Sequence, residues 1–150
     1  MYKNDKMSNI SYHGTNKENA TKIVGPPSSV DVNVGKGELG KGFYTGSSIA
    51  LAAIWAQLRY DTEAVVIEFD IPKPRFVQLK GILIKTQTEV VDTWKKLKEY
   101  SETTTHVFGH DYIVAPFATI EESGHQYKFE SKKAEDELNA SNKSVYPCVS

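Results

Sequence analysis

At 150 residues the chain is long enough for one domain with a buried core, and its 39% hydrophobic and 25% charged residues are typical of globular proteins. The net charge of −1 excludes a strongly basic protein with nucleic acid or an anionic membrane as an obligatory partner. A single cysteine, Cys148, excludes an internal disulfide and a multi-cysteine zinc site and suits a reducing compartment.

The ends and the apolar runs of the chain suggest one cytoplasmic domain. Residues 1–9 are polar and are expected to form a disordered N-terminal tail, followed by a single domain over residues 10–150. No apolar run approaches the roughly 18 residues that a membrane-spanning helix needs. The N-terminal residues also lack the apolar core of a signal peptide. We therefore expect no membrane partner.

The first quarter of the chain predicts a strand, a helix and a long loop. Residues 10–12 have the composition of a short strand. Thr15, with Glu18 three residues later, forms a capping-box pattern that would start a helix. Residues 25–40 are rich in Gly, Ser and Asp, and a loop of this length indicates a function such as a flap over a ligand.

The rest of the chain combines short β-branched strands with helices that have one apolar side. Strands are predicted at residues 42–45, 65–71, 76–79, 82–84, 112–115 and 126–131 and near Val145, and helices at residues 49–59, 88–100 and 133–139. Ser47 or Ser48 is expected to cap the helix at 49–59. Helices that gather early and between the strands, without regular βαβ alternation, predict an α+β fold.

The segment His13-Gly14-Thr15 at the end of the first strand is a candidate for ligand binding. In a binding site, His13 would hydrogen-bond a ribose hydroxyl, and Gly14 would offer its backbone to a carboxamide. In a purely structural turn, Gly14 would take a positive φ and Thr15 would cap the following helix. Both interpretations fit the segment.

The aromatic pair Phe43-Tyr44, which follows Gly40 and Gly42, is a second candidate. The glycines remove side chains where a ligand must pass, and Tyr44 presents an aromatic face. Trp55 follows on the predicted helix and could close a stacking slot for a flat polar ring such as nicotinamide. The alternative is a tight turn that leads into core aromatic side chains.

Five ordered motifs extend from about residue 11 to about residue 138. They are Tyr12-His13-Gly14-Thr15, Gly40-Lys41-Gly42-Phe43-Tyr44-Thr45, Ala52-Ala53-Ile54-Trp55-Ala56, Asp111-Tyr112-Ile113-Val114-Ala115-Pro116 and Gln126-Tyr127-Lys128-Phe129. In this order they resemble the NAD-dependent ADP-ribosyltransferases of the diphtheria-toxin and poly(ADP-ribose) polymerase type, and most closely the small bacterial members. The resemblance implies a split antiparallel β-core of two packed sheets with peripheral helices.

The resemblance also implies a set of residues that bind NAD as the co-substrate. These residues are His13, Gly14, Thr15, Phe43, Tyr44 and Trp55. His13 would hold the nicotinamide-side ribose, and Gly14 would bind the carboxamide through its backbone. Tyr44 would pack on the nicotinamide, with Trp55 as the second stacking aromatic.

The third motif of the family carries a Glu or Gln on a late strand, and here the resemblance assigns that position to Gln126. The implied catalytic residues are therefore His13, Tyr44 and Gln126. Cleavage of NAD builds an oxocarbenium-like ribose, which a carboxylate stabilises better than a neutral amide. Glu130 lies on the same face of the predicted strand and is an alternative catalytic residue. Gln126 is preferred for its Gln-x-x-Phe context; in a structural interpretation, both residues lie on the polar face of an edge strand.

The other histidines and the cysteine carry weaker signals. His106 and His110 could hold a metal ion only on a helix, which Gly109 and the preceding threonines oppose. We therefore expect no metal site. Cys148 has no basic neighbour nearby in sequence and shows no sign of an activated thiolate.

The resemblance predicts a mono-ADP-ribosyltransferase that cleaves NAD, releases nicotinamide and transfers ADP-ribose to a macromolecular acceptor, with protein favoured over nucleic acid. Gln in place of Glu favours mono-transfer, because chain extension in this family is associated with Glu. Small domains of this type are often toxins or effectors, which implies an antitoxin or target protein as a partner. Such a protein acts in its own cytoplasm or is delivered into the cytosol of a target cell. The alternatives are an inactive NAD- or ADP-ribose-binding module and an NAD glycohydrolase.

Overall fold

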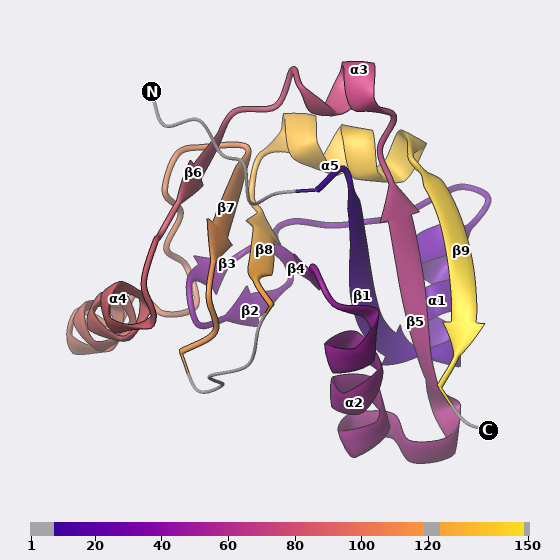
Figure 1. Cartoon of the computed structure of the whole chain (residues 1–150), viewed down its shortest axis with the longest axis horizontal. Coiled ribbons are helices and arrows are strands. Elements are labelled where there is room, and N and C mark those ends of the chain that lie inside the picture. The colour runs from indigo at the N-terminus through magenta and orange to yellow at the C-terminus, as the bar shows by residue number, and fades with distance from the viewer. Residues whose placement is uncertain (1–7, 119–123, 149–150) are drawn as a thin grey trace.

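The computed structural model describes residues 8–118 and 124–148, which combine nine strands with five α-helices (Figure 1). The strands are β1 (Ile10–Asn16), β2 (Lys36–Gly37), β3 (Gly40–Lys41), β4 (Phe43–Gly46), β5 (Ala64–Asp70), β6 (Gly81–Leu83), β7 (Tyr112–Ala115), β8 (Gln126–Phe129) and β9 (Asn142–Pro147). The helices are α1 (Lys17–Val24), α2 (Ile49–Tyr60), α3 (Lys73–Phe76), α4 (Gln87–Glu99) and α5 (Lys132–Ala140), with a 3-10 turn at Asp61–Glu63. The predicted α+β class is confirmed.

In the described part of the chain, seven strands form one mixed sheet in the order β6-β7-β8-β4-β1-β5-β9, and β2 and β3 form a separate hairpin. The sheet has two halves that meet at β4 and β1, where the register consists of the pair Tyr12–Gly46. By contrast, β1 pairs with β5 along its whole length, from Ile10 to Asn16. Figure 1 shows the long strands β1, β5 and β9 in one group and the shorter strands β6, β7 and β8 in a second group.

This sheet differs in two respects from the predicted core of two packed antiparallel sheets. The described strands form one hydrogen-bonded sheet, because β1 and β4 still pair at Tyr12 and Gly46. In addition, β6 and β7 run parallel to each other. The helix α4 connects these two strands, and a helical crossover of this kind returns the chain in the same direction.

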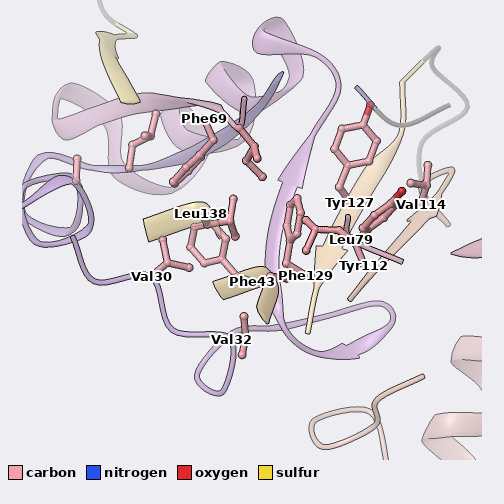
Figure 2. Packing of buried hydrophobic residues seen from close by; sticks show 14 of the residues in the cluster. Val30, Val32, Phe43, Phe69, Leu79, Tyr112, Val114, Tyr127, Phe129 and Leu138 are labelled. Atoms are coloured by element: carbon pink, nitrogen blue, oxygen red, sulfur yellow. The ribbon is translucent and has the colours of Figure 1, made fainter. Parts of the chain in front are cut away.

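Buried side chains from both halves of the sheet pack into one core together with α5 (Figure 2). Phe69 comes from β5, Phe43 from β4 and Phe129 from β8, while Leu138 joins them from α5. The rings of Phe43 and Phe69 meet edge to face, with centroids 5.6 Å apart. A second cluster contains Leu39, Val90, Ile113 and Ala115. The shared core joins the two halves where their backbone pairing is minimal.

Two predictions near the ends of elements are wrong. Residues 76–79 do not form a strand, because Lys73–Phe76 is a short helix with Pro74 in its first turn. Proline suits a helix start and lacks the N–H group that an inner strand needs. Thr15 does not cap α1, because β1 continues to Asn16, whose side chain accepts a hydrogen bond from the Asn19 amide at 2.8 Å.

Most other elements are confirmed with small shifts of their ends. Ser48 caps α2, since its hydroxyl accepts from the Leu51 amide at 3.2 Å. The last predicted strand is confirmed as β9, on the outer side of β5. The strand predicted at 126–131 ends at Phe129, because Ser131 instead caps α5 by accepting from the Ala134 amide at 3.0 Å.

Of the predicted disordered tail at residues 1–9, residues 1–7 lie outside the described residues, and residues 8 and 9 are described. Asn9 is tied to the sheet, because its side chain donates to Asp70 at 3.0 Å and its carbonyl accepts from the Ile71 amide at 3.0 Å. Across residues 8–118 and 124–148, no helix has both the length and the apolar character needed to cross a membrane.

We expect Leu138→Ala to lower the free energy of unfolding by about 2–5 kcal/mol, because it leaves a cavity in the shared core. Leu138 is 0% exposed, whereas Leu58 on α2 is 82% exposed. Leu58→Ala is therefore the matched control, with an expected effect within about 0.5 kcal/mol. Urea unfolding followed by circular dichroism measures both; equally small losses would contradict the packing of α5 in this core.

Candidate functional site

A cleft of about 770 Å³ is lined by β1, β4, the start of β8, the helices α1 and α2, and the β2–β3 hairpin. It brings together every residue that the sequence motifs assigned to NAD binding or catalysis, namely His13, Gly14, Thr15, Phe43, Tyr44, Trp55 and Gln126. Four of the five motifs of the chain thus meet at one place. The rest of the lining adds residues that the motifs did not include.

His13 belongs to β1, and its side chain contacts two residues of β4. Its ring stacks on Phe43, with centroids 4.4 Å apart and an interplanar angle of 25°. Its Nδ1 lies 2.7 Å from the carbonyl oxygen of Tyr44. A carbonyl can only accept, so Nδ1 carries the proton and donates, and Nε2 is the acceptor of the neutral ring. Burial lowers the pKa of His13, which favours this neutral form, although the bond to Tyr44 opposes the shift.

Gly14 is required by the close packing of β1 against α2. A Cβ atom at this position would lie 2.4 Å from the carbonyl oxygen of Ala52. The structural interpretation of Gly14 as a positive-φ turn is wrong, because the positive-φ glycines of the described chain do not include it. Thr15 is buried near the C-terminal end of β1, opposite Val65 of β5.

Tyr44 holds the β2–β3 hairpin against the sheet. Its hydroxyl donates to the carbonyl of Gly40 at 2.6 Å and accepts from the amide of Leu39 at 3.1 Å. A Cβ atom on Gly37 would lie 2.6 Å from the Tyr44 ring, so the hairpin backbone covers part of that ring. Burial raises the pKa of Tyr44, which keeps its hydroxyl protonated as a donor.

The segment predicted as a long loop therefore ends in a well-anchored hairpin. Leu39, in its turn, is fully buried against Ile113 and Ala115. The Lys41 amide also donates to the carbonyl of His106 at 3.1 Å. These contacts, added to those of Tyr44, fix the hairpin at one edge of the cleft.

Trp55 lies at the rim of the cleft with 39% of its surface exposed. Its ring contacts Phe117, with centroids 5.9 Å apart and an angle of 38°, and Arg59 lies 6.0 Å from its centroid. Phe117, which sequence reasoning missed, follows the motif that ends in Pro116. Among the described residues Trp55 thus has Phe117 as an aromatic neighbour, whereas the backbone at Gly37 packs on the ring of Tyr44.

Gln126 begins β8, a central strand between β7 and β4, and its side chain is directed by two acceptors. Its Nε2 donates to Oε1 of Glu38 at 2.7 Å and to the carbonyl of Pro116 at 3.1 Å. The interpretation of this segment as a polar edge strand is wrong, because β8 is paired on both sides and all its residues are buried.

Glu38 is a cleft residue that the sequence analysis did not single out. It lies in the turn between β2 and β3, 88 positions before Gln126, and its Oε1 also accepts from the Ala118 amide at 2.8 Å. A charged residue between Gly37 and Leu39-Gly40 was the signal available in the sequence. Its significance depends on a contact between distant segments, which no local pattern contains.

Glu130, the alternative catalytic residue, lies outside this cleft. Its buried side chain accepts from Lys128 Nζ at 2.7 Å and from the amides of Gly109 at 2.7 Å and His110 at 3.3 Å. Lys128 also donates to the carbonyl of His106 at 3.0 Å. Burial lowers the pKa of Lys128, and the adjacent Glu130 partly offsets this. The pair anchors the chain before β7, beside a separate cavity of about 610 Å³.

The described residues contain no group of three or more His, Cys, Asp or Glu side chains that could hold a metal ion. Nδ1 of His106 lies 3.6 Å from Oε2 of Glu102, and Nδ1 of His110 lies 3.2 Å from the carbonyl oxygen of Phe108. Burial raises the pKa of Cys148, which is the opposite of the shift in an activated thiolate.

One polar atom beside the cleft has no partner among the described residues. Thr45 is buried in β4, and its Oγ1 forms no hydrogen bond there. Buried hydroxyl groups are nearly always hydrogen-bonded in native proteins. The lining of the cleft also includes the basic side chains of Lys22, Lys36 and Arg59, of which Lys22 lies 3.5 Å from a carboxylate oxygen of Glu18.

Comparisons of the sequence with protein-family models and with curated proteins find no match.

We expect His13 to make the stability of the protein depend on pH. Because its folded-state pKa is lowered, the folded protein binds fewer protons than the unfolded chain once the pH falls below about 6.5, the ordinary histidine pKa. Stability contributed by His13 is therefore present above that pH and is lost as the pH falls, by at most about 1.4 kcal/mol per pH unit.

Urea unfolding of the wild type and of His13→Asn at pH 7.5 and 5.5 measures this effect. The asparagine amide can still donate to Tyr44 but does not titrate, and the other histidines are present in both proteins. The wild type should lose more stability between the two pH values. Identical losses would show that His13 titrates normally in the folded protein.

Proposed function

We propose that this protein is a mono-ADP-ribosyltransferase that cleaves NAD, releases nicotinamide and transfers ADP-ribose to a macromolecular acceptor. The observation that carries the proposal is the convergence of His13, Tyr44 and Gln126, from three separate motifs, on one cleft. We infer also that the fold is of the ADP-ribosyltransferase type. A sheet whose halves meet at a single pair, with the cleft beside that junction, supports this inference.

The residues of the cleft suit the parts of NAD. His13 Nε2 is an acceptor for a ribose hydroxyl, since Nδ1 is used by Tyr44. The unpartnered Thr45 Oγ1 is a further polar group beside the cleft. The exposed part of Trp55 offers an aromatic surface for a flat ring. The basic side chains of Lys22, Lys36 and Arg59 suit a pyrophosphate.

In the proposed reaction, the bond between the ribose C1′ and the nicotinamide nitrogen breaks, and its electron pair stays on the nitrogen. Nicotinamide leaves as a neutral molecule, and positive charge develops on the ribose. A lone pair of the acceptor then forms the new bond to C1′, and the acceptor loses its proton to solvent. The protein accelerates this step by fixing the ribose and by opposing the developing charge.

The acceptor is proposed to be a protein, and the biological setting that of a toxin or effector with a target protein or antitoxin as partner. Two other functions use the same cleft. An NAD glycohydrolase would transfer the ADP-ribose to water, and an inactive module would bind NAD or ADP-ribose without cleavage. The inactive module stays an alternative because the neutral amide of Gln126 stabilises a developing cation less well than a carboxylate does.

We expect His13→Ala to lower the rate of nicotinamide release at least tenfold, which corresponds to roughly 1.4 kcal/mol of lost transition-state stabilisation. Gln126→Ala should cause a comparable loss. The matched controls are His110→Ala and Glu130→Gln, because both residues lie outside the cleft. Chromatography of nicotinamide, together with melting curves of each variant, separates loss of turnover from loss of fold.

Incubation of the wild type with radiolabelled NAD and a cell lysate distinguishes the three functions. Labelled protein supports the transferase. Nicotinamide release without any labelled macromolecule would indicate the glycohydrolase, and saturable NAD binding without release would indicate the binding module. Full activity of Gln126→Ala with an inactive Glu130→Gln would move the catalytic role to Glu130.

A further inference from the structure

Glu38 brings a negative charge to the position where the third motif supplies only an amide. Its Oε1 lies 2.7 Å from Nε2 of Gln126, inside the cleft that also holds His13. Within residues 8–118 and 124–148, the ion pairs involve other carboxylates, and none neutralises Glu38. The cleft therefore contains a carboxylate that has no ion-pair partner among the described residues and contacts the catalytic candidate directly.

The contact also decides which atom of Gln126 can serve a ligand. The two hydrogens of the amide are directed to Glu38 and to the carbonyl of Pro116. Any hydrogen bond from this side chain to a ribose hydroxyl must then use the amide oxygen as the acceptor. Because the amide donates to a carboxylate, electron density shifts toward that oxygen, and hydrogen bonds to charged groups are the stronger ones.

The position of Glu38 is held by the fold and does not depend on Gln126. The turn that carries it is fixed by buried Leu39 and by the two hydrogen bonds of the Tyr44 hydroxyl. The Ala118 amide donates to the same Oε1 at 2.8 Å. A charge that is fixed in advance needs no reorganisation during the reaction, which is the condition for efficient electrostatic stabilisation.

We propose that Glu38 is a positioning residue of the transferase, which orients Gln126 and supplies through it the negative charge that stabilises the cationic ribose. This inference rests on the proposed function. It answers the chemical demand for a carboxylate at this site without moving the catalytic role to Glu130. The carboxylate comes from the hairpin and the hydrogen-bonding group from β8.

The test uses Glu38→Gln, which keeps an oxygen that can accept from Gln126 and Ala118 but removes the charge. We expect kcat for nicotinamide release to fall at least tenfold, with KM for NAD changed by less than about threefold and the melting temperature unchanged. The double variant Glu38→Gln/Gln126→Glu exchanges the two groups and should recover a large part of the lost kcat. Asp136→Asn on α5, outside the cleft, is the control for loss of an exposed carboxylate.

The single variant Gln126→Glu adds a second measurement, the pH dependence of turnover, which should not change if Glu38 has only a structural role. It brings two carboxylates within hydrogen-bond distance, so one of them keeps a proton and its pKa rises. That proton can take the place of the amide hydrogen, and turnover should fall as rising pH removes it. The wild type should lack this loss over the same pH range.

Three results would overturn the inference. Wild-type kcat in Glu38→Gln would show that the charge is not used. A lower kcat accompanied by a lower melting temperature, without recovery in the exchanged pair, would reduce Glu38 to a structural role. A wild type that releases no nicotinamide would remove the proposed function itself, and the positioning role of Glu38 with it. The first two results, by contrast, leave the proposed function intact.

Discussion

The early separation of β1 from β4 is the constraint on which the site depends. After the pair Tyr12–Gly46 the register of β1 and β4 does not continue, so side-chain contacts connect the two strands further along. His13 makes one of these contacts, because its Nδ1 donates to the carbonyl oxygen of Tyr44 at 2.7 Å. This hydrogen bond connects the two halves of the sheet, sets the tautomer of the His13 ring and directs Nε2 away from Tyr44. A structural role of His13 and a role toward a ligand are therefore compatible.

The hairpin depends on Tyr44 in a similar way. Its hydroxyl bonds the backbone on both sides of the turn, and its ring leaves room only for a glycine at position 37. Because the turn is fixed, its backbone holds Glu38 within hydrogen-bond distance of Gln126. The aromatic motif thus builds a wall of the cleft, and the stacking role that the resemblance assigns to Tyr44 stays a prediction. Trp55, which is 39% exposed, adds an aromatic surface at the rim of the cleft beside Phe117.

The two glutamates Glu130 and Glu38 differ in the groups that bind their carboxylates. Glu130 is four residues away along the chain, but Lys128 and two backbone amides occupy it, and its burial is tolerable because these donors compensate its charge. Glu38 is 88 positions away and is bound by Gln126 itself and by the Ala118 amide, both neutral donors. The ion pair of Glu130 and Lys128 anchors the chain, whereas a carboxylate that is bound only by neutral donors is available to act on a developing cation.

The sequence by itself determined the elements whose signals are local. The β-branched run of β5, the apolar side of α4 and the capping serine of α2 are readable because periodicity and caps act within one or two turns of chain. The ordered motifs also named His13, Tyr44 and Gln126, which line the cleft, but they did not name Glu38 or Phe117. Only the tertiary structure decided the register of β1, the parallel pair of β6 and β7, the reason for Gly14 and the partners of Gln126. These features depend on contacts between segments far apart in the chain, whose geometry is set by packing and hydrogen bonding across the sheet and not by the residues on either side.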